Sequence, residues 1–294
     1  MTVYPLILHL GTWPIIGQLT VTGYGLMMMA AFLAAGYAIQ LELRRRGLDE
    51  EYAASIVWWA VIGGLVGAKL WYVGLTHDPE VLFKRGGFVW YGGLIGGSGG
   101  VLLAGWLRKV PWRFTADLVA GPLALGYALG RVGCFLVNDD YGIPTSLPWG
   151  MKFPQGLPPT FVNNLEQLHV TFPPGTNPNL LVAVHPTEIY ETAIMLFVFW
   201  WLWKRRAHAH GMGWLFGCYL IFSGAERFLI EIVRAKDDRL LGPFTLAQAT
   251  AVIIVAIGFY LTRKWPVPDE TGADLPHLLA PKPPEPAKGM PATT

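Results

Sequence analysis

Residues 86–107 read GGFVWYGGLIGGSGGVLLAGWL and contain no charged side chain. A helix needs about 20 such residues to span the hydrocarbon core of a bilayer. Charge-free stretches of similar length occur near residues 19–41 and at 240–262. In hydrocarbon, backbone N–H and C=O groups must be satisfied within the segment, which favours a helix for each stretch. These stretches predict a helical integral membrane protein.

The composition agrees with a membrane protein and excludes several other classes. Of the 294 residues, 53% are hydrophobic and 14% are charged, whereas soluble domains carry about 25% charged residues. The 22 basic and 20 acidic residues nearly balance, and no basic stripe is present, which excludes nucleic acid as a partner. Two cysteines, Cys134 and Cys218, are too few for a disulfide framework. No His, Cys and carboxylate spacing matches a metal site, so neither a metal nor a cofactor is expected.

Further apolar stretches, each interrupted by one or a few charges, lie at 53–75, 114–138, 186–203 and 211–234. Together with the charge-free stretches they predict an all-α integral membrane protein with seven transmembrane helices. Basic residues of the connections set the orientation, because cytoplasmic loops carry an excess of Lys and Arg. Eleven of them lie in the connections on one side and six on the other. We therefore expect the N-terminus outside and the C-terminus in the cytoplasm.

Two segments fall outside the predicted spans. Residues 139–185 are rich in Pro and Asn and form an extracytoplasmic loop or head, and connections of this length are usually functional or disordered. Residues 265–294 contain eight of the 23 prolines and show no apolar period, which predicts a disordered cytoplasmic tail. The chain thus divides into a transmembrane domain, 1–264, which includes 139–185, and a tail, 265–294.

Ionisable residues inside the predicted spans need an explanation, because each costs about 2.5–3.5 kcal/mol on insertion scales. On the expected topology, Lys69, Arg131 and Arg227 all lie in the outer third of the membrane. The same level holds Tyr24, Tyr91, His185, Glu188 and Glu191. This placement predicts a single polar chamber that opens toward the outer leaflet. The alternative is that the three basic residues merely join helices by pairing with Glu188, Glu191, Glu226, Glu231 or Asp139.

The most informative segment is GRVGCFLVNDDYG, residues 130–142. It places the guanidinium of Arg131 near the end of an apolar helix, among small residues and before a pair of carboxylates. An arginine fork donates parallel charge-assisted hydrogen bonds to a phosphate, which suggests a phospholipid headgroup as ligand. The alternative is a snorkelling arginine capped by an acidic loop. Glycines at 63, 64 and 67 and the six glycines within 92–100 suit close helix packing, although Gly92 and Gly93 beside Tyr91 would also leave room for a lipid.

Six blocks, in order along the chain, resemble the bacterial prolipoprotein diacylglyceryl transferase family. They are Tyr24-Gly25-Leu26-Met27, Gly67-Ala68-Lys69-Leu70-Trp71-Tyr72, Tyr91-Gly92-Gly93-Leu94-Ile95-Gly96 (similar to HGGLIG), Gly130 to Gly142 (similar to GRxGNFxNxExxG), His185-Pro186-Thr187-Glu188-Ile189-Tyr190-Glu191 (similar to HPSQLYE), and the segment from Gly224 through Arg227, Glu231 and Arg234 (similar to RFxxExxR).

The resemblance implies an enzyme at the outer face of the bacterial cytoplasmic (inner) membrane. Such enzymes transfer the diacylglyceryl group of phosphatidylglycerol to the lipobox cysteine thiol in the signal peptide of a preprolipoprotein. A thioether forms and glycerol 1-phosphate leaves, which is the first step of lipoprotein maturation. By this resemblance Arg131 and Arg227 are catalytic residues that hold the phosphate and stabilise the leaving group. It also implies a phospholipid-binding set of Tyr24, Lys69, Gly92, Gly93, Gly142 and His185, and partners limited to phosphatidylglycerol, the signal peptide and membrane lipid.

The sequence departs from the family pattern where the thiol would be activated. Tyr91 stands where the family commonly has His, and a tyrosine with a pKa of about 10 is a poor base at neutral pH. Cys134 and Val137 replace common asparagines, Asp139 replaces Glu, and Lys69 replaces Arg. Asp139, Glu191 and Tyr91 are therefore all candidates for the thiol-activating step.

Two other functions remain open on the residues alone. A paralogous transferase acting on another phospholipid or acceptor would explain Tyr91. A lipid-binding or transport module would need polar groups on both sides of the membrane midplane, whereas the polar residues here lie toward one side.

Overall fold

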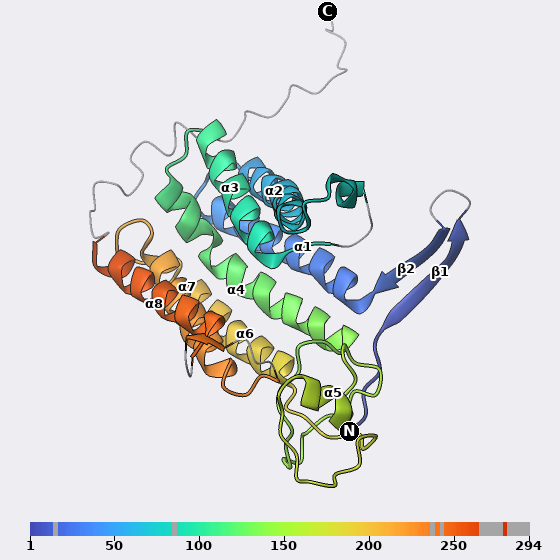
Figure 1. The fold of residues 1–294 in the computed structure, drawn as a ribbon. Helices are drawn as coiled ribbons and strands as arrows, with labels where there is room; N and C mark the ends of the chain where they lie inside the picture. Colours follow the sequence, from blue (N-terminus) through green and yellow to red (C-terminus); the bar gives the residue numbers. More distant parts are fainter. Residues whose placement is uncertain (14–16, 84–86, 236–238, 242–243, 265–278, 281–294) are drawn as a thin grey trace, which may run out of the picture. The chain divides into compact units, whose positions relative to one another are not determined.

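The computed structural model describes residues 1–13, 17–83, 87–235, 239–241, 244–264 and 279–280. Its described part is mostly helical (Figure 1). The helices are α1 Gly23–Arg45, α2 Glu51–Thr76, α3 Trp90–Leu107, α4 Trp112–Val137, α5 Val162–Gln167, α6 Thr187–Arg205, α7 Trp214–Ile230 and α8 Leu246–Lys264, with a 3-10 turn, η1, at Pro79–Phe83. Short antiparallel pairs join β1 Ile7–Trp13 to β2 Gly17–Thr22 and β3 Arg239–Leu241 to β4 Phe244–Thr245.

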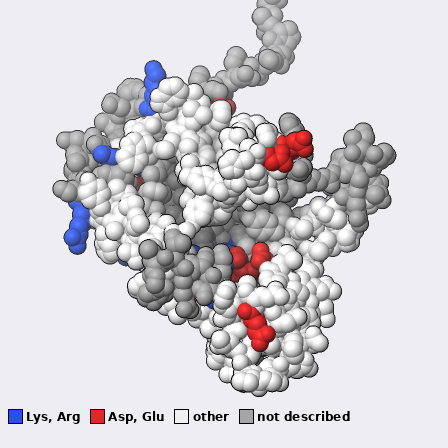
Figure 2. Space-filling view, in the orientation of Figure 1, with Lys and Arg blue, Asp and Glu red and all other residues white. Residues whose placement is uncertain are grey.

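Each of the seven apolar stretches contains one long helix, of 17 to 26 residues. Four of these, α1, α2, α4 and α8, are long and apolar enough to cross a membrane. The protein is therefore a helical membrane protein. Crossing by α3, α6 and α7 stays a prediction. Many large apolar side chains are exposed, among them Trp58, Trp106 and Ile253, and on the face shown in Figure 2 most of the described surface is neither acidic nor basic.

The first predicted stretch begins differently from expectation. Residues 19–22 do not start a helix but complete strand β2, which pairs with β1 in the register Ile7↔Thr22 and Leu8↔Val21. β2 reads GQLTVT, and its β-branched Thr and Val side chains favour an extended backbone. The helix begins at Gly23, directly after this strand.

The described chain forms two compact units. The first takes its residues from Met1–Ala35 and Ala116–Pro268, and the second from Gly36–Thr115 and Asp269–Thr294. In the second unit, α2 and α3 pack backbone against backbone. A Cβ added at Gly63 would overlap the carbonyl oxygen of Gly96, and one at Gly100 would overlap that of Trp59. Small residues at a helix contact allow such an approach, as is typical of membrane helices.

In the first unit, α4, α6 and α7 share an apolar core (Figure 1). Ala120, Ala124 and Ala128 follow one face of α4 at four-residue spacing and are fully buried. They pack with Met195, Val198 and Leu202 of α6 and with Leu215 and Cys218 of α7. Thr192 ties α6 to α4, because its hydroxyl donates to the Ala128 carbonyl at 3.3 Å as well as to Glu188 O at 2.7 Å. These contacts fix the helix ends that carry the polar cluster described below.

The segment 139–185 is folded. It contains α5 and several isolated β-bridges, and it has a core of its own formed by Tyr141, Phe153, Leu165 and Val184 together with Ala235. The Tyr141 hydroxyl donates to the Pro158 carbonyl at 2.5 Å, and the Tyr141 ring stacks on Phe153.

Of the predicted tail, residues 265–278 and 281–294 lie outside the described residues. Leu279 is buried, and its carbonyl accepts a hydrogen bond from the Asp49 N–H at 2.8 Å. The prediction of a disordered tail is otherwise untested.

Candidate functional site

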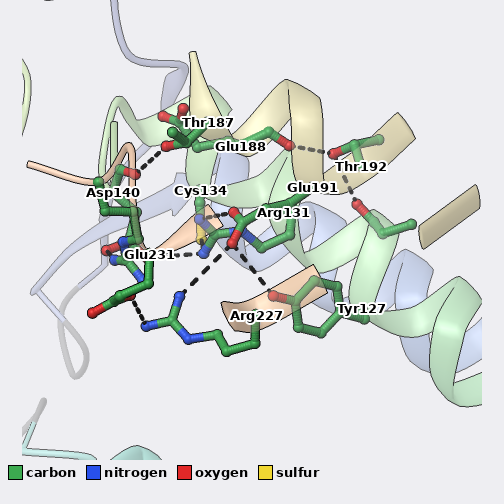
Figure 3. A network of polar contacts seen from close by, with 12 residues as sticks. Tyr127, Arg131, Cys134, Asp140, Thr187, Glu188, Glu191, Thr192, Arg227 and Glu231 are labelled. Carbon is green, nitrogen blue, oxygen red and sulfur yellow. Dashed lines mark hydrogen bonds and ion pairs between the residues drawn. The ribbon is translucent and has the colours of Figure 1, made fainter. Parts of the chain in front are cut away.

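The polar cluster of the first unit is built around Arg131, one and a half turns before the end of α4 (Figure 3). Its Nη1 donates to Asp140 Oδ2 at 2.9 Å and to Cys134 Sγ at 3.5 Å. Its Nη2 forms an ion pair with Glu191 Oε2. The side chain is 11% exposed, so this guanidinium is largely shielded from solvent and its interactions are screened weakly.

Glu191 is the carboxylate at the centre of the cluster. It lies on α6, is fully buried, and faces α4 and α7 together. The hydroxyl of Tyr127 donates to its Oε1 at 3.4 Å, and Nη1 of Arg227 lies 4.0 Å from the same oxygen. The distance to Arg227 is too long for a hydrogen bond. Glu191 is therefore held tightly by Arg131 and loosely by Arg227 (Figure 3).

Two more arginines of the cluster, Arg227 and Arg234, lie near the end of α7. Nη2 of Arg227 forms an ion pair with Glu231 Oε2 at 2.7 Å, which their i,i+4 spacing allows. Arg234, which follows the helix, does not join this pair but forms an ion pair with Asp140 Oδ1. Arg227 and Glu231 therefore pair at the end of α7, whereas Arg234 pairs with Asp140.

Asp140, and not Asp139, binds the arginines at the end of α4. Burial by itself raises the pKa of Asp140, but Arg234 and Arg131 outweigh burial, and the net effect lowers the pKa. Asp139 makes no ion pair within the described residues, and burial together with the charge of Asp140 raises its pKa. The expectation that Asp139 could pair with a basic residue of the spans is wrong, since the carboxylate next to it occupies that position.

A tight turn after α4 orients Asp140. Asn138 and Asp140 both have positive φ, 59° and 68°, a conformation that Asn and Asp tolerate better than most residues. The Asp140 carbonyl accepts a hydrogen bond from the Thr187 hydroxyl at 2.7 Å. Gly142 N then donates to His185 O at 2.8 Å. A Cβ at position 142 would lie 2.8 Å from the Cβ of His185 and would overlap the Val233 carbonyl, so the structure assigns Gly142 to close packing.

Two further candidates lie at the edge of this cluster. Tyr24, near the start of α1, packs against Gly133, where an added Cβ would lie 3.2 Å from its ring, and its side chain is exposed. His185 Nδ1 lies 3.2 Å from the Tyr190 hydroxyl, which accepts a hydrogen bond from Trp149 Nε1 at 2.7 Å. Tyr24 thus contacts α4 at Gly133, two residues after Arg131. His185 instead belongs to a separate chain of hydrogen bonds with Tyr190 and Trp149.

Glu188 and Glu226 are buried carboxyls of a different kind. Glu188 is fully buried on α6, one turn before Glu191, and Glu226 precedes Arg227 on α7 and is 3% exposed. Within the described residues neither carboxyl forms an ion pair or a hydrogen bond. Neither pairs with the basic residues of the spans, as the helix-joining alternative had allowed.

The remaining candidates belong to the second unit and are described within it. Lys69 Nζ donates to the Val81 carbonyl at 3.1 Å and lies 4.6 Å from the centre of the Phe88 ring. Tyr91 is exposed at the start of α3. A Cβ at Gly92 would overlap the Gly67 carbonyl, so the structure gives Gly92 a packing role, whereas one at Gly93 would make ordinary contact with Ala68 at 3.7 Å. Their part in a lipid site stays a prediction.

Comparison with known proteins identifies the family. Residues 12–263 match the family model described as prolipoprotein diacylglyceryl transferase. The chain belongs to this family. A Clostridium tetani protein named phosphatidylglycerol–prolipoprotein diacylglyceryl transferase is 31% identical over 252 residues, covering 83% of this chain and 92% of its own length. Proteins with the same name from Nostoc sp. (31% over 266 residues, 86% and 90% covered) and Cupriavidus metallidurans (33% over 257 residues, 80% and 82% covered) are similar.

This transferase has polar residues that the sequence alone did not single out as parts of the site. Tyr127 lies one turn before Arg131 on α4, and its spacing could have placed it on the same face. Asp140 carried no such signal, because two adjacent aspartates cannot be told apart without the geometry of the turn. Within the described residues no group of three or more His, Cys, Asp or Glu side chains is arranged to hold a metal ion.

Proposed function

We propose that this transferase moves the diacylglyceryl group of phosphatidylglycerol to the lipobox cysteine thiol of a preprolipoprotein and releases glycerol 1-phosphate. The observation that carries the proposal is the pair of guanidiniums, Arg131 and Arg227, that flank one buried carboxylate, Glu191, on three apolar helices. Charges in such helices are costly and mark functional sites. The curated relatives bear the name of this reaction.

In the proposed reaction the substrate thiolate attacks the glyceryl carbon that bears the phosphate ester. The carbon–sulfur bond forms, the carbon–oxygen bond breaks, and the electron pair leaves with glycerol 1-phosphate. Negative charge therefore grows on the phosphate group in the transition state. Arg131 and Arg227 bind that phosphate and stabilise the growing charge, as preorganised donors do in other group transfers. The nucleophilic sulfur comes from the substrate, so Cys134 has no required part.

The proposed site faces the outer leaflet of the bacterial inner membrane. Seven spanning helices follow from the apolar stretches, and an outside N-terminus and a cytoplasmic C-terminus follow from the distribution of basic residues between the helices. This topology puts the ends of α4 and α7, the start of α6 and the folded segment 139–185 on the outer side, and residues 265–294 in the cytoplasm. Lipobox cysteines of exported signal peptides reach the same side. Tyr24, Lys69, Gly92, Gly93, Gly142 and His185 complete the proposed lipid-binding set.

A lipid-transfer assay with purified full-length protein tests this function. The protein is mixed with phosphatidylglycerol and a lipobox peptide, and diacylglyceryl-peptide is measured by mass spectrometry. Arg131→Ala and Arg227→Ala should each abolish transfer, whereas Arg44→Ala, at a solvent-exposed arginine paired with Glu50, should retain it. Full activity in both site variants would refute the phosphate clamp.

A second candidate is a paralogous transferase that uses another phospholipid or acceptor. Tyr91 favours it, because the family commonly has His at this position. Tyr91→His separates the two candidates. If the wild type transfers lipid to the lipobox peptide, the first candidate stands. If only the His variant does so, the natural acceptor is a different molecule.

A further inference from the structure

The cluster contains more carboxyls than guanidiniums. Three arginines, Arg131, Arg227 and Arg234, lie against five carboxyls, Glu188, Glu191, Glu226, Glu231 and Asp140. An ionised carboxyl buried without a partner is strongly unfavourable. Glu188 and Glu226 are the members without an ion pair or hydrogen bond in the described part of the chain. If these two carry protons, the remaining three carboxylates balance the three arginines and the resting site is neutral.

Among the three balancing carboxylates, Glu191 is the one placed against both proposed phosphate-binding arginines. Asp140 bridges Arg131 and Arg234, and Glu231 pairs with Arg227. A phosphate bound between Arg131 and Arg227 would occupy the donors that Glu191 now uses or approaches. Glu191 is fully buried and cannot turn to water for compensation. When phosphate is bound, Glu191 must therefore take up a proton, or the cluster carries one excess negative charge.

We propose that Glu191 is a displaceable counter-ion that takes up a proton when a lipid phosphate occupies Arg131 and Arg227: without an acceptor the proton comes from solvent, and when the acceptor thiol is already bound the proton comes from that thiol. The inference rests on the proposed function, because it takes the phosphodiester as the ligand of the two arginines. With the acceptor bound, phosphate binding thereby converts Glu191 from a partner of Arg131 into the base that the thiol needs.

The step balances in atoms and charge. The thiol S–H bond breaks and its proton moves to a Glu191 carboxylate oxygen. The sulfur lone pair forms the bond to the glyceryl carbon, and the phosphate oxygen leaves with the electrons of the carbon–oxygen bond. Glu191 later returns the proton to the leaving phosphate monoester or to solvent and pairs again with Arg131. No oxidant, metal or second co-reactant is needed.

The surroundings of Glu191 suit this exchange. The groups that face it on the neighbouring elements are Tyr127, Arg131 and Cys134 of α4, Asp140 after α4, Glu188 of α6, Glu226 and Arg227 of α7, and Arg234 after α7. When Arg131 turns to phosphate, the Tyr127 hydroxyl still donates to Glu191 and holds its orientation. A neutral Glu226 adds no opposing charge.

Proton uptake on lipid binding tests the inference without any acceptor peptide. Short-chain phosphatidylglycerol is titrated into the detergent-solubilised full chain by calorimetry in two buffers of different ionisation enthalpy at neutral pH. About one proton should be taken up per lipid bound, since binding and protonation are linked. Glu191→Gln should bind lipid with essentially no uptake. Glu188→Gln, an equally buried carboxyl on the same helix, should retain the wild-type uptake.

The outcomes separate the inference from the proposed function. Lipid binding by the wild type without proton uptake overturns the counter-ion exchange, and so does uptake that persists in Glu191→Gln. This wild-type result stands even if the Glu191 variant does not fold. Absence of phosphatidylglycerol binding, or absence of lipobox transfer by a wild type that takes up a proton with the lipid, contradicts the proposed function instead.

Discussion

Helices pack differently in two regions of the molecule: the contact of α2 with α3, and the cluster at the ends of α4, α6 and α7. α2 and α3 meet through glycines, so that backbone lies against backbone, and no charged side chain takes part in the contacts of Gly63, Gly96 and Gly100. The other helices share an alanine-lined core and then bring buried charges together at one end. The glycine contact depends only on the close fit of two backbones. The cluster buries guanidiniums, which carries an unfavourable desolvation free energy.

The difference teaches which residues need a functional explanation. Close packing accounts for Gly63, Gly67 and Gly96 in full, because any larger residue would overlap a carbonyl. Packing does not account for Glu191 or Arg131, since apolar residues of similar volume would fill the same space without a desolvation cost. We therefore expect substitutions at the glycine contact to affect folding, and substitutions in the cluster to affect catalysis more than folding.

The largest expected effect is the loss of the glycine contact. Gly96→Leu places a side chain against the carbonyl of Gly63 and should destabilise the protein by about 3 kcal/mol or more, as severe overpacking does. The melting temperature and the yield of detergent-solubilised protein measure it. Gly99→Leu, on the same helix with open space around its Cβ position, is the matched control and should behave like the wild type. Equal stability of the two variants would contradict the packing account.

The helices were predictable because their signal is length and lack of charge. The apolar stretches 53–75 and 114–138 were predicted to be helices. α2 begins two residues earlier and ends one residue later than its stretch, and α4 begins two residues earlier and ends one residue earlier. The β1–β2 pair was not predictable from apolar content, because strands and helices of the first 41 residues are equally poor in charge. Only the alternation of Thr and Val in residues 17–22 hints at the strand. The fold of segment 139–185 depends on contacts far apart in sequence, such as that of Tyr141 with Phe153.

The second effect concerns Asp140, which holds Arg131 and Arg234 in place. Asp140→Asn should lower kcat/KM for lipid transfer about tenfold, since a charge-assisted hydrogen bond to a partly exposed carboxylate contributes about 1.5 kcal/mol. Arg131 then has a freer orientation, so KM for phosphatidylglycerol should rise. Asp139→Asn is the matched control and should change kcat/KM far less. A larger loss of kcat/KM in Asp139→Asn than in Asp140→Asn would indicate that Asp139, and not Asp140, positions the arginines.

The charged helix residues of the site were predictable, but Tyr127, Asp140 and the pairing of the charges were not. Arg131, Arg227 and Glu191 were expected because charges are rare in apolar helices, and the structure brings these three together. Which carboxylate meets which arginine depends on backbone angles that no pattern reveals. The positive φ of Asn138 and Asp140 turns Asp140 toward Arg131. Glu188 and Glu191 look equivalent in sequence, one helical turn apart. Among the described residues the Glu188 carboxyl has no hydrogen-bond or ion-pair partner, whereas Glu191 is the centre of the cluster.

The smallest effect is the opposite response of the two adjacent aspartates to acid. The pKa of Asp140 is lowered, so its ionised form stabilises the fold above its unfolded pKa of about 4, and this stabilisation is lost as pH falls through the lower folded value. The pKa of Asp139 is raised, so its ionised form disfavours the fold at neutral pH, and this penalty is relieved as pH falls toward 4.

Melting temperatures of the two Asn variants in detergent, measured at neutral pH and near pH 4, check these signs. At neutral pH, Asp140→Asn should melt below the wild type and Asp139→Asn at or above it. Toward pH 4 the Asp139→Asn difference should shrink, because Asp139 takes up a proton over this range. The Asp140→Asn difference should largely persist there and shrink only below pH 4, where the folded protein begins to protonate Asp140. A neutral-pH loss of stability in Asp139→Asn equal to that in Asp140→Asn would mean that the turn does not discriminate between the two carboxylates, and that either aspartate can pair with Arg131.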